Sequence, residues 1–315
     1  MQKYTSIKDI ISLPVLVEEA IFLKQHPHDF EQLGKRKILG MLFFNPSLRT
    51  RLSTQKAALN LSMNVIVMNI SNDGWILEFD DGTVMENNSA EHVKEAAQVI
   101  SQYCDVLAIR AFAGLKDRDE DYSEKVISSF VKYATIPIVS LESATGHPLQ
   151  ALADTITIKE FQQKKHPKVV LTWAPHPRAL PQAVANSFVE FIKNTAATLV
   201  VTHPKGYELN KEIMKGVSVE YNQDKAFEDA DFIYAKNWSS YFDYGKILST
   251  DKNWMVTATK MQLTNNAKFM HCLPVRRNVV VADQVLDNEN SIVIQQANNR
   301  TYAAQVILKK ILENG

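Results

Sequence analysis

A short segment of the chain combines positive charge with hydroxyl groups directly after an apolar run. Residues 43–51 read FFNPSLRTR, after the run KILGMLFF and before the helix-like run TRLSTQKAALNLSM. Pro46 is expected to end a strand, and Ser47 to cap the following helix. The first N–H groups of that helix, with the guanidinium of Arg49, could bind a phosphate group. A capped helix whose arginines pair with surface carboxylates would explain the same letters.

Other expected strand ends carry polar side chains that could complete such a site. Arg110 ends the run DVLAIR, His147 and Gln150 open HPLQALAD, and KFMHCLPVRR contains His271 and Cys272. Alone, each has an ordinary explanation, such as a salt bridge for Arg110 or a buried apolar contact for Cys272. Ligands of doubly wound folds gather at the carboxyl ends of strands. A cation, an imidazole and a phosphate cradle at successive strand ends therefore indicate one binding site.

Short β-rich runs alternate with amphipathic helical runs. The expected strands are KILGMLFF, NVIVMNI, DVLAIR and TIPIVSL, then KVVLTW, ATLVVTH, DFIYA, KFMHCLP and SIVIQQ. This alternation predicts an α/β fold with two doubly wound parallel-sheet domains. With 315 residues and 45% apolar content, the chain can form two cores of about 150 residues each. We expect a first domain at 1–146 and a second at 147–297, with a helix at 298–315 packing back on the first.

Composition excludes several functional classes. Lys plus Arg and Asp plus Glu both total 35, so no net field attracts nucleic acid or an anionic membrane. Cys104 and Cys272 form neither a metal motif nor a disulfide framework, which favours the cytoplasm. The N-terminus lacks the apolar stretch of a signal peptide, and no run approaches roughly 18 apolar residues. We therefore expect no metal, no nucleic-acid partner and no membrane partner.

The candidate motifs resemble those of a known family. SLRTR, the Arg110 strand end, HPLQALAD and HCLP, in this order and spacing, resemble the carbamoyl-phosphate signatures of the aspartate and ornithine carbamoyltransferases. The resemblance covers nearly the whole chain and implies carbamoyl transfer in arginine biosynthesis, without metal or cofactor. The carbamoyl-phosphate site that it implies comprises Ser47, Leu48, Arg49, Thr50, Trp75, Arg110, His147, Gln150, Cys272, Leu273 and Arg300. Trp75 would reach a neighbouring subunit's site, which implies a homotrimer, and Arg51 would be structural.

The chemistry of carbamoyl transfer assigns roles within that set. An amine attacks the carbamoyl carbon, negative charge grows on the carbonyl oxygen, and phosphate leaves. Thr50, Arg110 and His147 are expected to donate hydrogen bonds to this oxygen, each lowering the barrier by about 3 kcal/mol. Cys272 and the Leu273 carbonyl would orient the carbamoyl NH₂ group. The departing phosphate can itself accept the proton of the amine. Thr50, Arg110, His147 and Cys272 are thus the expected catalytic residues.

The residue at position 236 bears on the acceptor amine. Ornithine members of the family carry an Asp-x-Trp segment here, whose carboxylate holds the α-ammonium group of ornithine. This chain reads DFIYAKNWSSY and has Lys236 instead. A cation suits an acylated α-nitrogen with a free α-carboxylate, as in the N-acylornithine branch of the family. His176, Glu142 and Arg276 are expected to complete this substrate site. Alternatively, Lys236 is an ordinary surface lysine without a role in substrate binding.

Ala90 bears on the choice of acyl group. Acetylornithine members of the family resemble TVMENNSAEHVKEA but place Glu at this position, where a carboxylate would repel a succinyl tail. They also carry a modified lysine where this chain has Val280. The expected substrates are therefore carbamoyl phosphate and N-succinyl-L-ornithine, with N-acetylornithine or ornithine as alternatives.

Two further expectations concern the fold and the class of protein. Pro175, Pro177 and Pro181 stiffen a loop that, in this branch, encloses a later segment, which implies a knotted second domain. An ordinary ornithine or aspartate carbamoyltransferase, or a non-catalytic phosphate-binding α/β protein, would each fit part of the same pattern.

Overall fold

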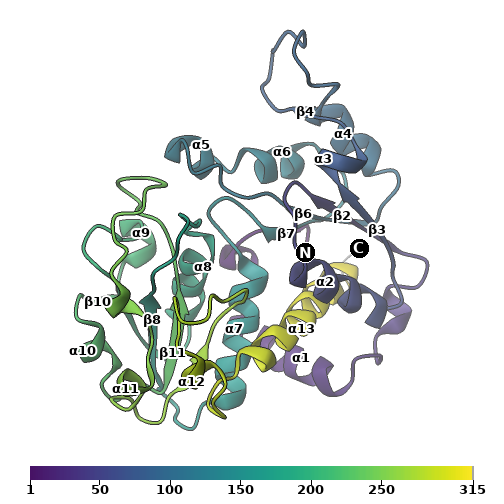
Figure 1. Ribbon diagram of the computed structural model, residues 1–315. Helices are drawn as coiled ribbons and strands as arrows, with labels where there is room; N and C mark the ends of the chain where they lie inside the picture. The colour runs from purple at the N-terminus through teal and green to yellow at the C-terminus, as the bar shows by residue number, and fades with distance from the viewer. Residues whose placement is uncertain (314–315) are drawn as a thin grey trace. The chain divides into compact units, whose positions relative to one another are not determined.

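The computed structural model describes residues 1–313, apart from the side chain of Ser71. The chain divides into two compact units (Figure 1). The first unit contains residues 1–114, 119–149 and the chain from Arg300, and the second contains residues 115–118 and 150–299. The chain passes from the first unit to the second within helix α7, Pro148–Phe161, between Leu149 and Gln150. The boundary expected from the sequence was after residue 146.

The first unit is built on a parallel sheet. Its strand order is β1 (Lys3–Tyr4), β7 (Ile138–Glu142), β6 (Val106–Arg110), β2 (Ile38–Phe43) and β3 (Asn64–Asn69). Helices α4 (Val93–Ile100) and α6 (Lys125–Tyr133) cover one face. On the other face lie α1 (Leu13–Gln25), α2 (Arg49–Asn60) and the part of α13 (Val293–Leu312) from Arg300 onward (Figure 1). Helices on both faces bury the strands, which explains their nearly continuous apolar letters.

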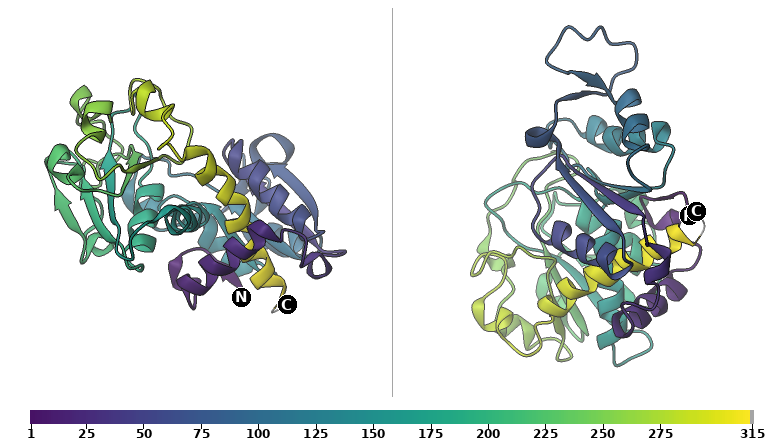
Figure 2. Two further views of the ribbon diagram at one scale, coloured as in Figure 1. Left: turned by 90° about the horizontal axis from the view of Figure 1, so that it is seen from below. Right: turned by 90° about the vertical axis from the view of Figure 1, so that its right-hand side faces the viewer.

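Short elements complete the first unit. They are 3-10 turns at Ile7–Asp9 and Glu31–Leu33, helices α3 (Ile70–Asp73) and α5 (Arg118–Tyr122), and the paired strands β4 (Leu77–Glu78) and β5 (Glu91–His92). The first residue of α5, Arg118, belongs to the second unit, and the rest of the helix belongs to the first. The loop that joins β4 to β5 projects away from the sheet of its unit (Figure 2, right).

The second unit repeats the architecture. Its parallel sheet has the order β10 (Ser218–Glu220), β9 (Thr198–Thr202), β8 (Lys168–Trp173), β11 (Phe232–Lys236) and β12 (Lys268–Met270). Alternate residues of β8 face opposite cores. Val169 and Leu171 pack with α8 (Ala183–Ile192), and Val170 packs in the core that contains α10 (Gln223–Phe227) and α12 (Asp283–Leu286). The remaining helical segments are α9 (Lys211–Met214), α11 (Ala258–Met261) and a 3-10 turn at Lys252–Trp254.

These sheets confirm the predicted α/β class with parallel sheets in two units. The predicted strand SIVIQQ is wrong, because α13 already begins at Val293. The buried positions Val293, Gln296 and Arg300 recur with the period of a helix, but two of them are polar, so the apolar letters alone suggested a strand. The short strands β1, β10, β4 and β5 were not predicted, since runs of two or three residues carry too little pattern.

The predicted helix cap at Ser47 is also wrong. Helix α2 begins at Arg49, and the residue at its cap position is Leu48, with helical angles φ −91° and ψ −61°. A leucine side chain cannot accept a hydrogen bond, so the first turn is entered without the side-chain cap that the sequence indicated. Leu48 is 67% exposed and Ser47 is half-buried beside it.

Candidate active site

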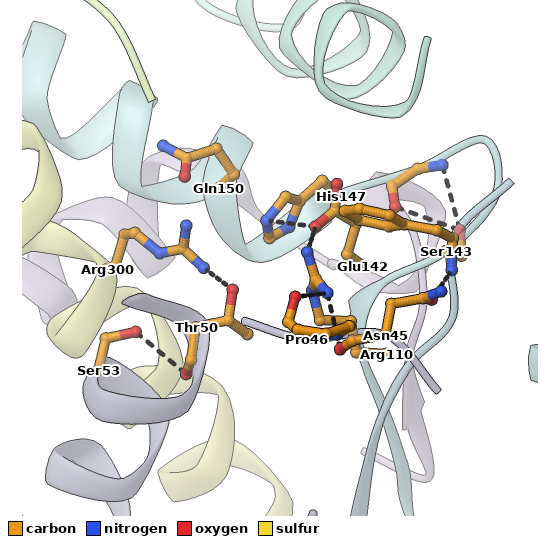
Figure 3. A network of polar contacts seen from close by, with 12 residues as sticks. Asn45, Pro46, Thr50, Ser53, Arg110, Glu142, Ser143, His147, Gln150 and Arg300 are labelled. Atoms are coloured by element: carbon orange, nitrogen blue, oxygen red, sulfur yellow. Dashed lines mark hydrogen bonds and ion pairs between the residues drawn. The ribbon is translucent and has the colours of Figure 1, made fainter. Parts of the chain in front are cut away.

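Arg110 and Glu142 end neighbouring strands of the first unit. In the register of the sheet, Arg110 lies between Phe43 of β2 and Glu142 of β7, with an irregularity between Ile109 and Arg110. Its Nη2 lies 3.2 Å from Oε2 of Glu142 (Figure 3). Both residues are buried, so each charge depends on the other for compensation.

The same guanidinium organises the turn that precedes α2. Nη1 of Arg110 donates hydrogen bonds to the carbonyl oxygens of Asn45 at 3.0 Å and Pro46 at 2.6 Å (Figure 3). The side-chain oxygen of Asn45 accepts a hydrogen bond from the N–H of Phe112, at 2.6 Å. The ring of Phe112 in turn lies 3.9 Å from the Arg110 guanidinium carbon. The strand end of β6 therefore holds the Asn45–Pro46 segment that leads into α2.

Positive charge is concentrated around this turn. Burial lowers the pKa of Arg110, the charge of Glu142 raises it, and the nearby charge of Arg49 lowers it. Nη2 of Arg300, on α13, donates a hydrogen bond to Oγ1 of Thr50 at 2.5 Å (Figure 3). An anion bound at the start of α2 would relieve the repulsion between Arg49 and Arg110 and could accept hydrogen bonds from their guanidinium groups.

His147 joins the Arg110–Glu142 pair from the chain just before α7. Its Nε2 lies 3.6 Å from Oε2 of Glu142, and the residue is 3% exposed. The following Pro148 carbonyl accepts a hydrogen bond from the Tyr4 hydroxyl at 3.2 Å. Glu142 thus lies between Arg110 and His147 in the first unit, in contact with two residues expected at the carbamoyl group.

The second unit gathers another cationic cluster at its strand ends. His176 follows β8, Lys236 ends β11, and Arg276 follows β12. Nε of Arg276 donates a hydrogen bond to Nε2 of His176 at 3.1 Å. With Nε2 as the acceptor, the ring proton is assigned to Nδ1, which lies 2.8 Å from the carbonyl oxygen of Arg178 and 3.1 Å from its backbone nitrogen. This cluster presents positive charge on a neutral imidazole scaffold.

The charges of the cluster act on one another. Burial lowers the pKa of His176, and the charges of Arg276, Lys236 and Arg178 lower it further, whereas the bond to the Arg178 carbonyl raises it. The Lys236 side chain is buried, and its Nζ donates to the carbonyl oxygen of Asn237 at 3.0 Å. Concentrated positive charge of this kind suits a ligand with carboxylate groups.

The HCLP segment forms a tight turn after β12. Leu273 has a left-handed backbone, φ 54°, and its N–H donates to Nδ1 of His271 at 2.8 Å. Cys272 is half-buried at the edge of the core that contains α8. Gln150, near the start of α7, is buried and belongs to the same unit. Val280, farther along, is a buried apolar residue.

Two predicted site residues lie apart from these clusters, near the projecting β4–β5 loop. Trp75 is 58% exposed, and its Nε1 donates to Oε2 of Glu91 at 2.9 Å. Ala90 is exposed, and its N–H donates to the carbonyl oxygen of Ile76 at 3.0 Å. Trp75, just before β4, and Ala90, just before β5, therefore lie close together where the β4–β5 loop begins and ends.

The structure thus distributes the predicted residues over separate groups. The first unit brings together Arg49, Thr50, Arg110, Glu142, His147 and Arg300, and the second brings together His176, Lys236 and Arg276. Sequence reasoning missed Asn45 and Arg178. Arg178 could have been found as a second cation beside His176 in WAPHPRALP.

Two further features of residues 1–313 concern metal binding and membrane spanning. In this range no group of three or more His, Cys, Asp or Glu side chains could hold a metal ion. Over the same described residues, no helix combines the length and apolar character needed to cross a bilayer.

Comparison with protein families defines the class. Residues 4–160 match the carbamoyl-phosphate binding domain of the aspartate/ornithine carbamoyltransferases, and residues 181–311 match the Asp/Orn binding domain. The chain therefore belongs to the aspartate/ornithine carbamoyltransferase family, and the prediction of a carbamoyltransferase is confirmed.

Individual relatives show which members of the family the chain resembles. The chain is 52% identical to the N-succinylornithine carbamoyltransferase of Bacteroides fragilis over 316 residues, covering 100% of this chain and 99% of the relative. It is 34% identical to the N-acetylornithine carbamoyltransferase of Xanthomonas axonopodis pv. citri, covering 94% and 92% of the two chains. A crystal structure of acetylornithine transcarbamylase complexed with acetylcitrulline has a TM-score of 0.93 and 32% identity, over 99% of each chain. The predicted similarity to enzymes of N-acylated ornithine is thereby confirmed.

Proposed function

We propose that the protein transfers the carbamoyl group of carbamoyl phosphate to the δ-amine of N-succinyl-L-ornithine. The products are N-succinyl-L-citrulline and phosphate, in arginine biosynthesis. The observation that carries this proposal is the cationic cluster of Lys236, His176 and Arg276 at the strand ends of the second unit. The N-succinylornithine carbamoyltransferase relative, 52% identical over the full chain, supports the same assignment.

The first-unit cluster is proposed to hold carbamoyl phosphate. Ser47, Leu48, Arg49 and Thr50 would bind the phosphate through the first turn of α2 and its side chains, with Arg300 fixed on Thr50 beside them. Arg49 already lies close enough to Arg110 to lower its pKa. A dianionic ligand at this point would be stabilised by both guanidinium groups, which favours the phosphate over a neutral ligand.

The chemical step follows from where charge develops. Thr50, Arg110 and His147 would donate hydrogen bonds to the carbamoyl oxygen as it becomes negative. The buried pair with Glu142 holds the Arg110 side chain in place before reaction, so little reorganisation is needed. Gln150, Cys272 and the Leu273 carbonyl would bind the carbamoyl group, and the leaving phosphate accepts the amine proton.

Lys236 is proposed to bind the α-carboxylate of the acceptor. A lysine beside Arg276 and Arg178 would repel the α-ammonium group of free ornithine, whereas acylation removes that charge and leaves the carboxylate. Glu142 was expected near this substrate, but its contacts to Arg110 and His147 support a role at the carbamoyl group instead.

The succinyl preference is proposed to depend on Ala90. Its small, neutral side chain would leave room for a succinyl carboxylate, and Trp75 lies nearby, next to the Ile76 carbonyl that accepts the Ala90 N–H. Related structures agree with this idea: variants of N-acetyl-L-ornithine transcarbamylase in which a glutamate is replaced by Ala, Val, Ser or Pro were crystallised with carbamyl phosphate and N-succinyl-L-norvaline.

A homotrimer with shared active sites is also proposed. The exposed side chain of Trp75, just before β4, supports it, because a residue there could reach a neighbouring subunit's site. A cytoplasmic location is consistent with the two free cysteines. A knot in the second domain stays a prediction from the proline-rich loop at residues 175–181.

The test of the proposed function is citrulline-type product formation from carbamoyl phosphate, with ornithine, N-acetylornithine and N-succinylornithine assayed in parallel. We expect the highest kcat/KM with N-succinylornithine. Preference for free ornithine would overturn the role of Lys236, and preference for the acetyl compound would overturn that of Ala90. If no phosphate is released with any of these amines, the protein would instead be a phosphate-binding protein without transferase activity.

The Lys236→Met variant isolates the acceptor site. Methionine keeps most of the length of the side chain but removes the charge, so KM for N-succinylornithine should rise at least about tenfold. Lys225→Met is the matched control, since Lys225 is an exposed lysine within α10 in the same unit. Equal KM values in both variants would contradict the proposed carboxylate contact.

A further inference from the structure

A buried carboxylate connects two parts of the second unit that come from distant parts of the chain. Asp154 lies on α7 and is 0% exposed. Its Oδ1 accepts a hydrogen bond from Nε2 of Gln150 at 2.7 Å, and another from Nε2 of Gln296 at 2.7 Å. Gln296, on α13, in turn accepts a hydrogen bond at Oε1 from the N–H of His271, at 2.9 Å. The chain of contacts therefore runs from Gln150 to the HCLP turn.

The chemistry of the carboxylate fixes the orientation of both amides. Oδ1 of Asp154 accepts both hydrogen bonds, so Gln150 and Gln296 each turn their NH₂ group toward it. Gln296 then presents its carbonyl oxygen to the backbone of His271, and Gln150 presents its carbonyl oxygen away from Asp154. An oxygen in that position can accept a hydrogen bond from an N–H group such as the carbamoyl NH₂.

The link also sets the HCLP turn. The N–H of His271 is held by Gln296, and Nδ1 of His271 accepts the N–H of Leu273 at 2.8 Å. Leu273 needs this support because its φ of 54° is unfavourable for a residue with a branched side chain. Tyr234 lies beside both ends of the link: burial, then the proximity of Asp154 and Cys272, raises the pKa of its phenol well above the ordinary value.

We infer that Asp154 and Gln296 are positioning residues for carbamoyl transfer: they fix the Gln150 amide and the Cys272–Leu273 turn in one relative arrangement, so that both can bind the carbamoyl group. This inference rests on the proposed function, because it takes Gln150, Cys272 and Leu273 as the carbamoyl contacts. Neither Asp154 nor Gln296 touches the substrate in this account. The network lies wholly within the second unit and is buried, so water cannot replace its bonds at low cost.

A neighbouring contact supplies a matched control. Nδ2 of Asn299 donates to Oγ1 of Thr157 at 3.0 Å, and so joins α13 to α7 within the same unit. Thr157 is 0% exposed, and its Oγ1 donates to the carbonyl oxygen of Ala153 at 2.7 Å. These bonds link the same two helices without reaching the HCLP turn. Thr157→Val should therefore reproduce the loss of a buried polar contact without changing the carbamoyl contacts.

The experiment measures binding of carbamoyl phosphate and of inorganic phosphate to the full-length protein. Gln296→Met releases the His271 N–H, and Asp154→Asn removes the fixed orientation of the amides, since asparagine also carries donor hydrogens. Each variant should raise the Kd of carbamoyl phosphate about tenfold or more. The Kd of inorganic phosphate, which lacks the carbamoyl group, should change less than about twofold. Thr157→Val should leave both constants within about twofold, even if its Tm falls.

The outcomes separate the inference from the proposed function. An unchanged Kd for carbamoyl phosphate in both folded variants, or equal weakening of both ligands, would overturn the positioning role. If one variant does not fold, the other decides. If the parent binds carbamoyl phosphate but carbamoylates no acylated ornithine, the proposed function fails while the binding ratio still tests the inference. If the parent does not bind carbamoyl phosphate, both are wrong.

Discussion

Arg110 and Glu142 are register partners at the carboxyl ends of β6 and β7, and their side chains form an ion pair of 3.2 Å. The same guanidinium holds the carbonyl oxygens of Asn45 and Pro46 in the turn before α2. Parallel strands thus bring a cation, its counter-ion and the turn of the next helix to one edge of the sheet. Removing the arginine would leave a buried carboxylate uncompensated, so substitutions here must separate chemistry from folding.

Arg110→Lys keeps the charge at this position but removes the planar fork. A lysine cannot hold Glu142, two carbonyl oxygens and a developing oxyanion in the same geometry. We expect kcat to fall about 100-fold to 1000-fold, as for the loss of an oxyanion donor. Steady-state assay with carbamoyl phosphate and the preferred amine measures this, with Tm as the check on folding.

Arg277→Lys is the control for Arg110→Lys. Arg277 is exposed and pairs with Asp283 at 2.9 Å and Asp287 at 2.7 Å. Exposed ion pairs contribute little, and Arg277 has no predicted contact with substrate, so its kcat should stay within about twofold of the parent. A folded Arg110→Lys enzyme that matched this control would remove Arg110 from the mechanism.

Arg49 and Arg51 lie in the same helical turn but should behave oppositely. Arg51 donates a hydrogen bond to Asn69 and lies 4.8 Å from the centre of the Phe43 ring, whereas Arg49 repels Arg110. Arg51→Ala should lower the free energy of unfolding by about 1 kcal/mol, with little effect on KM for carbamoyl phosphate. Arg49→Ala should raise that KM at least about tenfold without loss of Tm.

Thermal unfolding and initial rates on both arginine variants check this contrast. The prediction is contradicted if Arg51→Ala raises KM as much as Arg49→Ala, because the turn would then act as one unit.

Ala90→Glu should change the choice of acyl group. The position is exposed and its backbone N–H is bonded to Ile76, so a longer side chain can be accommodated. A carboxylate there would repel the succinyl carboxylate, so the ratio of kcat/KM for N-succinylornithine to that for N-acetylornithine should fall at least about tenfold. Ala90→Gln, which adds a similar volume without charge, should have a smaller effect. If both variants had the same effect, the choice of acyl group would depend on the size of the side chain at this position and not on its charge.

His176 should titrate below its ordinary pKa of about 6.5. Burial lowers its pKa, and the charges of Arg276, Lys236 and Arg178 act in the same direction. Since the folded protein favours the neutral ring, the stabilisation is complete above about pH 6.5 and is lost as the pH falls toward the folded-state pKa. NMR titration of the ring measures the value directly.

Arg276→Gln supplies the second half of the His176 test. Removing the guanidinium removes a repelling charge and the donor to Nε2, so the pKa of His176 should rise toward its ordinary value. A pKa that stays the same in this variant, or that exceeds 6.5 in the parent, would show that the cationic cluster does not act on the ring.

Local pattern was sufficient for most strands but not for the helix starts. KVVLTW was predicted as a strand and is β8, Lys168–Trp173, because an apolar β-branched run buried on both faces has few alternatives. The strand predicted at SIVIQQ is wrong because this segment begins α13. Its Gln296 is buried and hydrogen-bonded to Asp154 and His271, and a local pattern does not reveal such burial of a polar residue. The predicted Ser47 cap is wrong because Leu48, which already has helical backbone angles, occupies the cap position.

The sequence by itself determined the family, the parallel α/β class and the residues able to do chemistry, because motifs, periodicity and charge are properties of the chain order. Only the tertiary structure decided which of those residues meet. It placed Glu142 with Arg110 and His147, His176 with Arg276, and Asp154 between Gln150 and Gln296. Such contacts join residues far apart in the chain, and they follow from strand register and helix packing, which local sequence does not specify.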